Sequence, residues 1–334
     1  MKIAFFEVAD EEKTYFQEKL PNDDLIFLEE PLDEDFGLSL AEVEILSVFI
    51  YSKVTAKVLK KMPKLKLVIT RSTGFDHIDL AYCKENKILV ANVPLYGENT
   101  VAEHTFALIL ALSRKIVASN EHIRHNNDFS LEGLRGFDLE GKTIGIIGTG
   151  KIGAKVAKMA NSFGMKIIAF DKFQNEDLIK KYKVEYLPLK KVLAESDVIS
   201  LNMRHTAETH HMINAQTIES IKPGAILVNT ARGGLIDTPC LLPALESGKL
   251  AGVGLDVLEE EGAVKEDIAL SSRQFTRRSL MVGLANAMLT HKSNVIVTPH
   301  NAFNSVEAFR RIMDTTIDDI LAFQKSEPIN LVKE

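Results

Sequence analysis

Short apolar runs alternate with amphipathic stretches along almost all of the 334 residues, and this alternation limits the fold more than any other feature. It is the pattern expected when parallel strands are joined by helices that cover a sheet. In the first hundred residues the predicted strands are KIAFF, EILSVFI, KLVIT and ILVANV. A second series follows: TIGIIG, KIIAF, VEY, DVISLN, AILVNT, GVGLDV and NVIVTP. The fold class is therefore predicted to be α/β, with doubly wound parallel sheets.

Two helices stand out among these strands. The stretch NTVAEHTFALILALSRKIVASNEHIRH predicts one long helix that begins at Asn99 or Thr100. The helix SVEAFRRIMDTTIDDILAFQ follows the final strand and is predicted to return to the first sheet. The region between Glu261 and Val295 is the least regular and only partly helical. Its arginines, which include Arg278, are expected to form a solvated face, with an anion contact as the alternative.

Composition excludes several classes of protein. The net charge of −6 supplies no positive field for a polyanion, so a nucleic-acid partner is not expected. The longest apolar run, TFALILAL, is far shorter than the roughly 20 residues that span a bilayer. Glu7 interrupts the first apolar run, which therefore does not resemble a signal peptide. Cys83 and Cys240 form no C-x-x-C pair, so a cytoplasmic protein with free structural thiols and no membrane association is expected.

The string GTGKIG, residues 148–153, lies between the predicted strand TIGII and a predicted amphipathic helix. Alone, such a string suits a flexible turn as well as a phosphate-binding loop. In this context Gly148 permits the turn, Gly150 lets the backbone approach a pyrophosphate, and Gly153 allows close packing of helix on strand. The helix N-terminus would then attract the phosphates. The sequence predicts a dinucleotide site here.

Asp171 ends the next predicted strand, 18 residues after Gly153. A carboxylate at this position can accept hydrogen bonds from both ribose hydroxyls, and it would repel a 2′-phosphate. NAD is therefore favoured over NADP, although Lys172 beside the acid leaves the strictness of that preference open.

Three further strand ends carry chemically useful side chains: Arg232 in NTARGG, Asp256 with three glutamates in LDVLEEE, and His300 in TPHNAF. Individually, they could be an exposed loop arginine, an acidic turn and a residue at a helix start. Ligands of open α/β sheets bind beyond the carboxyl ends of the strands. Because all three lie at the ends of the sheet that holds the glycine string, we expect them to belong to one site.

The order and spacing of seven stretches resemble the D-isomer-specific 2-hydroxyacid dehydrogenases, over nearly the whole chain. These stretches are RSTGFDHIDL, VPLYGENTVAEHTFALIL, GKTIGIIGTGKIG, DVISLN, LVNTARGGLID, GLDVLEEE and VTPHNAF. The D-lactate dehydrogenase branch is the most similar, with a tyrosine where Tyr96 stands and an aromatic residue where Phe303 stands. The resemblance implies an NAD-binding Rossmann domain, residues 101–300, inserted into a discontinuous flavodoxin-like substrate domain of residues 1–100 and 301–334. It also implies a homodimer formed through the long helix.

The same resemblance assigns catalytic roles. The family's arginine falls on Arg232, its glutamate on Glu261 and its histidine on His300. In reduction of a 2-oxo acid by NADH, protonated His300 would give its proton to the carbonyl oxygen. Arg232 would bind the carboxylate and carbonyl oxygens with its planar fork. Glu261 would hold the imidazole and favour its charged form.

Further residues are expected to bind substrate and cofactor. The backbone N–H groups of Thr73 and Gly74 would hold the substrate carboxylate, and Tyr96 and Phe303 would close a small apolar pocket, with ordinary core packing as the alternative for both aromatics. Contacts with NAD are expected from a larger set: Thr105, Gly148, Gly150, Lys151, Ile152, Gly153, Asp171, Asn202, Thr230, Ala231 and Asp256.

Other histidines are not expected to bind a metal ion. His210 and His211 are adjacent, so in a strand they would face opposite ways, and His122 and His125 lack an evident third ligand. His104 is interpreted as a partly buried histidine, with a supporting role near Arg232 as the alternative.

These expectations describe an NAD-dependent enzyme that interconverts a small 2-oxo acid and a D-2-hydroxy acid, with pyruvate and D-lactate as the first choice. Some positions depart from the family pattern: Arg204–Thr206 replaces PLT, Gly262 replaces a proline and His77 replaces an asparagine. Glyoxylate, hydroxypyruvate or a bulkier 2-oxo acid therefore remains an alternative substrate. An NADH-sensing, corepressor-like binding protein is the alternative outside catalysis.

Overall fold

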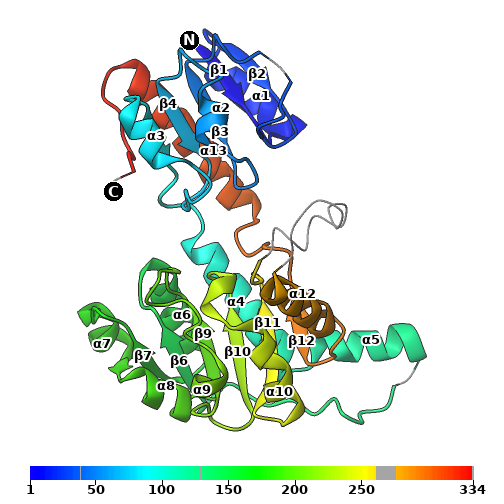
Figure 1. Cartoon of the computed structure of the whole chain (residues 1–334). Coiled ribbons are helices and arrows are strands. Elements are labelled where there is room, and N and C mark those ends of the chain that lie inside the picture. The colour runs from blue at the N-terminus through cyan, green and yellow to red at the C-terminus, as the bar shows by residue number, and fades with distance from the viewer. Residues whose placement is uncertain (38, 128, 261–275, 333–334) are drawn as a thin grey trace. The chain divides into compact units, whose positions relative to one another are not determined.

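A computed structural model describes residues 1–37, 39–127, 129–260 and 276–332. The chain divides into two compact units, Met1–Tyr96 with Ser305–Glu334, and Gly97–Asn304. A fully parallel sheet lies at the centre of each unit (Figure 1). This confirms the predicted α/β class.

The first unit contains a five-stranded sheet in the order β2-β1-β3-β4-β5, which is the flavodoxin-like order. Its strands are β1 (Lys2–Phe5), β2 (Asp24–Phe27), β3 (Ile45–Val48), β4 (Leu67–Thr70) and β5 (Leu89–Asn92). Its helices are α1 (Asp10–Lys19), α2 (Ala56–Leu59), α3 (Leu80–Glu85) and α13 (Val306–Gln324).

Helix α13 joins the first unit although it lies more than 200 residues from β5 in the sequence. Its buried residues Ile317 and Ile320 pack in one cluster with Phe5 and Phe16 from β1 and α1. After α13 the chain returns to β5, where Leu331 forms an antiparallel bridge with Ala91. Both chain ends therefore contribute to one hydrophobic core.

The second unit contains a seven-stranded sheet in the order β12-β11-β10-β9-β6-β7-β8. Counted from β6, this is the Rossmann order with a seventh strand added at one edge. The strands are β6 (Thr143–Ile147), β7 (Lys166–Phe170), β8 (Glu185–Tyr186), β9 (Val198–Leu201), β10 (Ala225–Asn229), β11 (Leu250–Leu255) and β12 (Val295–Val297). The helices are α4 (Glu98–Ser113), α5 (Ile116–Asn126), α6 (Lys151–Ser162), α7 (Glu176–Tyr182), α8 (Leu189–Glu195), α9 (Ala215–Ile218), α10 (Leu241–Glu246) and α12 (Arg277–Thr290).

Alternate residues of the central strands enter two separate hydrophobic clusters. In β6, Ile146 belongs to one cluster and Ile147 to the other, and in β10 the same holds for Ile226 and Leu227. Because successive side chains of a strand point to opposite faces, each cluster covers one face of the sheet. Burial on both faces explains why these strands are near-continuous runs of valine, isoleucine and leucine.

The long helix expected from Asn99 or Thr100 is in fact two helices. Helix α4 begins one residue earlier, after Gly97 as N-cap, and ends at Ser113. Lys115 then adopts a left-handed conformation with φ of +54°, and α5 follows it. The carbonyl of Ser113 accepts a hydrogen bond from the distant amide of Phe137 (2.9 Å), so a tertiary contact terminates α4.

Two more features complete the fold. No helix among the described residues combines the length and apolar character needed to cross a bilayer. Both cysteines are free, and burial raises the pKa of Cys83 to about 11 and that of Cys240 to about 12. Neither thiol is therefore poised to ionise near neutrality.

Candidate active site

The glycine string forms the turn between β6 and α6. Gly148 has φ of +94°, a conformation that favours glycine. A Cβ atom on Gly153 would lie 2.0 Å from the carbonyl oxygen of Gly148, so only glycine lets the helix pack this close to the strand end. A Cβ on Gly150 would meet nothing within 4 Å, which leaves the start of α6 open to a ligand. These three environments fit the pyrophosphate of a dinucleotide.

Asp171 follows β7 and contacts this turn. Its Oδ2 accepts hydrogen bonds from the amide of Thr149 (2.6 Å) and from the Thr149 hydroxyl (3.1 Å). The hydroxyl of Tyr186 donates to Thr149 Oγ1 at 2.9 Å. The carboxylate therefore lies beside the glycine turn, where the family resemblance expects the ribose.

Asn202 follows β9 and has a buried acceptor that no described group satisfies. Its side-chain amide donates to the carbonyl and the hydroxyl oxygen of Ser200 (3.1 and 3.0 Å), while Oδ1 has no hydrogen-bond partner. Buried polar atoms are rarely left unpaired, so Oδ1 fits a position where a ligand donates a hydrogen bond. The buried Thr105 and Thr230, which are also expected to contact the cofactor, are joined by a hydroxyl hydrogen bond of 2.9 Å.

Arg232 lies in the turn that follows β10. The buried Asn229 shapes this turn, because its Oδ1 accepts from the amide of Ala231 (3.0 Å) and its Nδ2 donates to the carbonyl of Arg232 (2.9 Å). The Arg232 side chain is exposed, and its Nη1 donates to the Ala231 carbonyl (2.8 Å). The guanidinium is thus available to an anionic ligand at the carboxyl end of the sheet.

His300 lies two residues after Thr298 in the loop beyond β12, with φ of +54°. Asp256, which is 1% exposed, organises this loop. Its Oδ1 accepts from the hydroxyl of Thr298 (2.5 Å) and the amide of Asn301 (2.7 Å), and its Oδ2 accepts from the amide of Ala302 (2.9 Å). The Asp256 carboxylate therefore supports the backbone that presents His300.

Two neighbours complete the loop. The Phe303 ring lies edge-on to the His300 ring, with the centroids 6.4 Å apart. His104 Nε2 is 3.0 Å from the Thr298 hydroxyl and 3.4 Å from Asp256 Oδ1. His104 is partly buried and hydrogen-bonded, as its first interpretation expects, and these contacts lie at the His300 loop.

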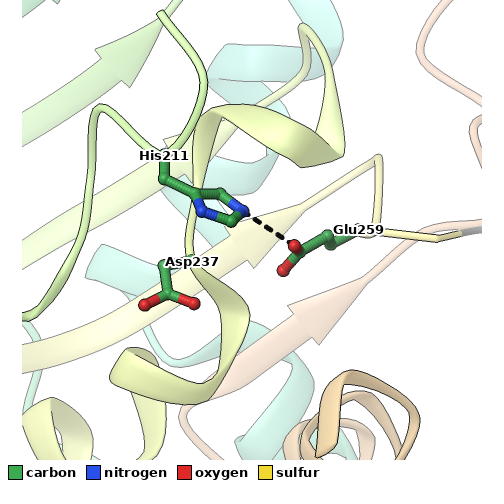
Figure 2. Close-up of side chains that lie close together, drawn as sticks. All are labelled: His211, Asp237 and Glu259. Atoms are coloured by element: carbon green, nitrogen blue, oxygen red, sulfur yellow. Dashed lines mark hydrogen bonds and ion pairs between the residues drawn. The ribbon is translucent and has the colours of Figure 1, made fainter. Parts of the chain in front are cut away.

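Glu261 lies outside the described residues. Glu259, two positions earlier, has a nearly buried carboxylate 2.8 Å from Nε2 of His211, and Asp237 lies beside both (Figure 2). These three residues have the donor atoms of a metal site. However, Nη2 of Arg278 is 2.6 Å from Asp237 Oδ1 and 3.0 Å from Glu259 Oε1, so a guanidinium already supplies the positive charge.

The first unit carries the other predicted substrate residues. Thr73 and Gly74 follow β4, where the Thr73 hydroxyl donates to the carbonyl of Val93 (2.9 Å) and the carbonyl of Gly74 accepts from Ser72 (2.6 Å). Tyr96 is partly buried, and its carbonyl accepts from Nε of Arg311 (2.7 Å). The second unit carries every other predicted site residue that the structure describes.

Residues 106–302 match the family described as D-isomer specific 2-hydroxyacid dehydrogenase, NAD binding domain. The chain belongs to this family. Among the relatives of this dehydrogenase, a D-lactate dehydrogenase of Escherichia coli is 33% identical and covers 98% of both chains. A glyoxylate reductase of Korarchaeum cryptofilum is 36% identical over 84% of this chain and 80% of its own.

One solved structure similar to this dehydrogenase is that of D-lactate dehydrogenase from Aquifex aeolicus, complexed with NAD and lactic acid. It is 39% identical, with a TM-score of 0.85, and the match covers 99% of this chain and 98% of the other. The comparisons confirm the family and its NAD-binding domain, both of which the motifs predicted.

Sequence reasoning missed the contacts around Glu259. The expectation that His210 and His211 lie in a strand and face opposite ways is wrong, because both lie in a turn and their rings stack with centroids 3.6 Å apart. Arg278 is exposed, as expected of a solvated face, and it also binds two carboxylates, which the sequence did not identify. The run of three glutamates was a signal of clustered charge, but nothing in it indicates which glutamate turns inward.

Proposed function

We propose that this dehydrogenase interconverts pyruvate and D-lactate with NAD as cofactor. Membership of the family supports the reaction class. The observation that supports pyruvate and D-lactate as substrates is the 39% identity, over 99% of this chain, to a D-lactate dehydrogenase whose structure contains NAD and lactic acid. We also assign Tyr96 and Phe303 to the side chain of the substrate, as the family resemblance implies.

NADH, when bound, supplies the hydride that reaches the carbonyl carbon of the 2-oxo acid. His300 in its protonated form donates a proton to the carbonyl oxygen, and in the oxidation of the hydroxy acid the neutral imidazole takes that proton back. Histidine suits both directions because imidazole titrates near neutrality. The support that Asp256 gives to the loop would keep the imidazole in one orientation.

Arg232 binds the substrate carboxylate and polarises the carbonyl group. A guanidinium offers two parallel N–H donors to a carboxylate, which a lysine ammonium does not. Glu261 retains the role that the family gives it, as the acid that stabilises the charged imidazole. Thr73, Gly74 and Tyr96 are the substrate contacts that we assign to the first unit, and we propose this unit as the substrate domain.

Several features of the second unit support NAD binding. The open face at Gly150 accommodates the pyrophosphate, and the start of α6 supplies N–H groups to it. Asp171 would accept hydrogen bonds from the ribose hydroxyls and disfavour the 2′-phosphate of NADP. The unpaired Oδ1 of Asn202 would receive a hydrogen bond from the cofactor. The other residues that we propose as cofactor contacts are Thr105, Lys151, Ile152, Thr230, Ala231 and Asp256.

A glyoxylate reductase with 36% identity favours glyoxylate as the second candidate substrate. The test measures NADH oxidation at fixed enzyme concentration with pyruvate, glyoxylate, hydroxypyruvate and a branched 2-oxo acid. The proposal predicts the highest kcat/KM with pyruvate. A higher kcat/KM with glyoxylate or with a bulky acid would reject the substrate assignment. Tight NADH binding without turnover of any acid would indicate an NADH-sensing protein instead.

We also propose a cytoplasmic homodimer. Helix α12 exposes large apolar side chains, of which Leu280, Leu284 and Met288 are spaced four residues apart and so share one face. Helix α5 exposes Ile116 and Ile123. Apolar helix faces of this kind are typical of subunit contacts. Light scattering should give twice the chain mass of 37.1 kDa, and a value of one chain mass would reject the dimer.

A further inference from the structure

The carboxylate of Glu259 joins three separate segments of the second unit. Its Oε2 accepts a hydrogen bond from the amide of Thr238 at 3.1 Å. Its Oε1 lies 2.8 Å from Nε2 of His211 and accepts from Nη2 of Arg278 at 3.0 Å. Thr238 follows β10, His211 follows β9 and Arg278 lies in the first turn of α12. One nearly buried side chain therefore connects the segment that follows β11 to three other segments of the second unit.

Arg278 strengthens this connection. Its Nη2 also donates to Oδ1 of Asp237 (2.6 Å), so one guanidinium bridges two carboxylates. A second residue of α12, Asn286, donates from Nδ2 to the backbone carbonyl of Glu259 (3.1 Å). We refer to Glu259, His211, Asp237 and Arg278 as the Glu259 network.

Both carboxylates of the network accept hydrogen bonds. Burial by itself raises the pKa of Glu259, but hydrogen bonds from Thr238, Arg278 and His211 outweigh it and hold the pKa below its usual value. A buried carboxylate that remains ionised and paired resists separation from its partners, because breaking one bond leaves an uncompensated charge. The network is thus suited to hold backbone in place.

The backbone held in this way is the turn that carries Arg232. The amide of His211 donates to the carbonyl of Gly234 (2.9 Å), and the amide of Ile213 donates to the carbonyl of Leu235 (3.0 Å). A Cβ on Gly233 would lie 2.0 Å from the carbonyl oxygen of Leu258, so the turn and the segment before Glu259 are in direct contact. The turn directly after Arg232 is therefore enclosed by the two segments that the network joins.

We propose that Glu259 and Arg278 are positioning residues, which hold the turn of Arg232 so that its guanidinium receives the substrate carboxylate. This inference rests on the proposed function, because it assigns Arg232 to substrate binding. Neither residue touches the reacting atoms.

The test compares Glu259→Gln and Arg278→Gln with wild type, on the 2-oxo acid that wild type reduces with the highest kcat/KM. Glutamine preserves the size of the Glu259 side chain but cannot pair with a guanidinium charge. Misplacement of Arg232 should lower kcat/KM about 10- to 100-fold, mainly through a higher KM, because small errors in position weaken oriented binding steeply. The Kd for NADH should rise much less than KM, since the glycine turn lies outside the network and only Thr230 and Ala231 of the proposed cofactor contacts belong to the displaced turn.

Lys222→Gln is the matched control. Lys222 forms an ion pair with Asp197 at 2.8 Å in the same unit, but Asp197 directly precedes β9 and so lies at the amino ends of the strands. The control should behave as wild type. Arg278 is 42% exposed, so its variant keeps the test decisive if Glu259→Gln does not fold. The kcat/KM of the double variant should be no lower than that of the more impaired single variant, because both changes break one network.

Three results would overturn the inference. The first is that both single variants have the same kcat/KM as the Lys222→Gln control. The second is an equal loss of NADH affinity, which would indicate general damage to the fold. The third is strictly additive losses in the double variant. If wild-type enzyme reduces no 2-oxo acid at all, the proposed function fails first, and the role assigned to these residues fails with it.

Discussion

His300 is presented by a left-handed backbone conformation in a loop that Asp256 holds through three hydrogen bonds. Substitution His300→Ala removes the proposed proton donor and leaves the glycine turn intact. We expect kcat to fall about 10²- to 10⁴-fold, as is typical for loss of a general acid. The Kd for NADH, measured by fluorescence titration, should stay at its wild-type value. Wild-type turnover in this variant would remove His300 from the mechanism.

Asp171 contacts the amide and the hydroxyl of Thr149 in the glycine turn. In Asp171→Asn the negative charge is lost, so the repulsion of a 2′-phosphate disappears. The ratio of kcat/KM for NADH to that for NADPH should therefore fall. Thr149→Val is the control, because it removes one hydroxyl contact with Asp171 and keeps the charge. Equal losses with both cofactors in Asp171→Asn would contradict our account of cofactor choice.

At the scale of single residues, the sequence identifies side chains by type and position but not by the direction in which they turn. The positions of Arg232 and His300 after β10 and β12 could be predicted because strand ends are visible as the ends of apolar runs. The contacts of Glu259 with His211 and Arg278 could not, because these residues are separated by 48 and 19 positions. Only the folded sheet brings such residues together.

Helix α13 contains a buried carboxyl group that affects stability. Burial raises the pKa of Asp319 to about 7, although the hydrogen bond that it accepts from Asn330 acts in the opposite direction. Its second carboxylate oxygen, Oδ2, has no hydrogen-bond partner. Because the folded pKa is raised, the native state binds more protons than the unfolded state between about pH 4 and pH 7. The free energy of unfolding therefore falls as pH rises through this window, by ~1.4 kcal/mol for each unit of the shift.

Substitution Asp319→Asn should remove this fall in the free energy of unfolding with rising pH. The amide is uncharged at every pH, so the variant should be more stable than wild type at pH 8 and lose most of that advantage near pH 4. Urea unfolding at several pH values measures this difference. Asp318→Asn, at the exposed neighbouring position of α13, should change stability far less. The prediction would be contradicted if the free energy of unfolding of wild type rose between pH 5 and 7 relative to that of Asp319→Asn.

Helix α7 ends at Tyr182, and its C-cap residue Lys183 has φ of +54°. Glycine adopts this conformation without steric cost, so Lys183→Gly should raise the free energy of unfolding by about 0.5–1 kcal/mol. Lys181→Gly, inside the same helix, should lower it by a similar amount, about 1 kcal/mol. Thermal unfolding of the two variants measures the contrast. Destabilisation by both would show that the conformation of Lys183 does not limit stability.

Elements with strong apolar patterns could be predicted, and weaker ones could not. The central strands of the second sheet, β6, β9, β10 and β11, are buried on both faces, so most of their residues are apolar. Strand β2 is an edge strand whose residues are exposed or half-buried, and it left no comparable signal. The break between α4 and α5 depends on the bond from Phe137 to Ser113, which local sequence does not encode.

At the scale of the whole molecule, strand order could be inferred only through the family resemblance. Apolar runs indicate that parallel strands exist, but the orders β2-β1-β3-β4-β5 and β12-β11-β10-β9-β6-β7-β8 depend on crossover connections. In each sheet the order of the strands reverses at one point, between β1 and β3 in the first unit and between β6 and β9 in the second, and ligands of open α/β sheets bind at such a point. In the second unit the glycine turn lies at this point, after β6.

The most direct test of the central claim is the identity and handedness of the product formed from pyruvate. Purified enzyme is incubated with pyruvate and NADH, and the product is separated by chiral chromatography. Our account predicts D-lactate in an amount equal to the NADH consumed. Formation of L-lactate, or consumption of NADH without lactate, would contradict it.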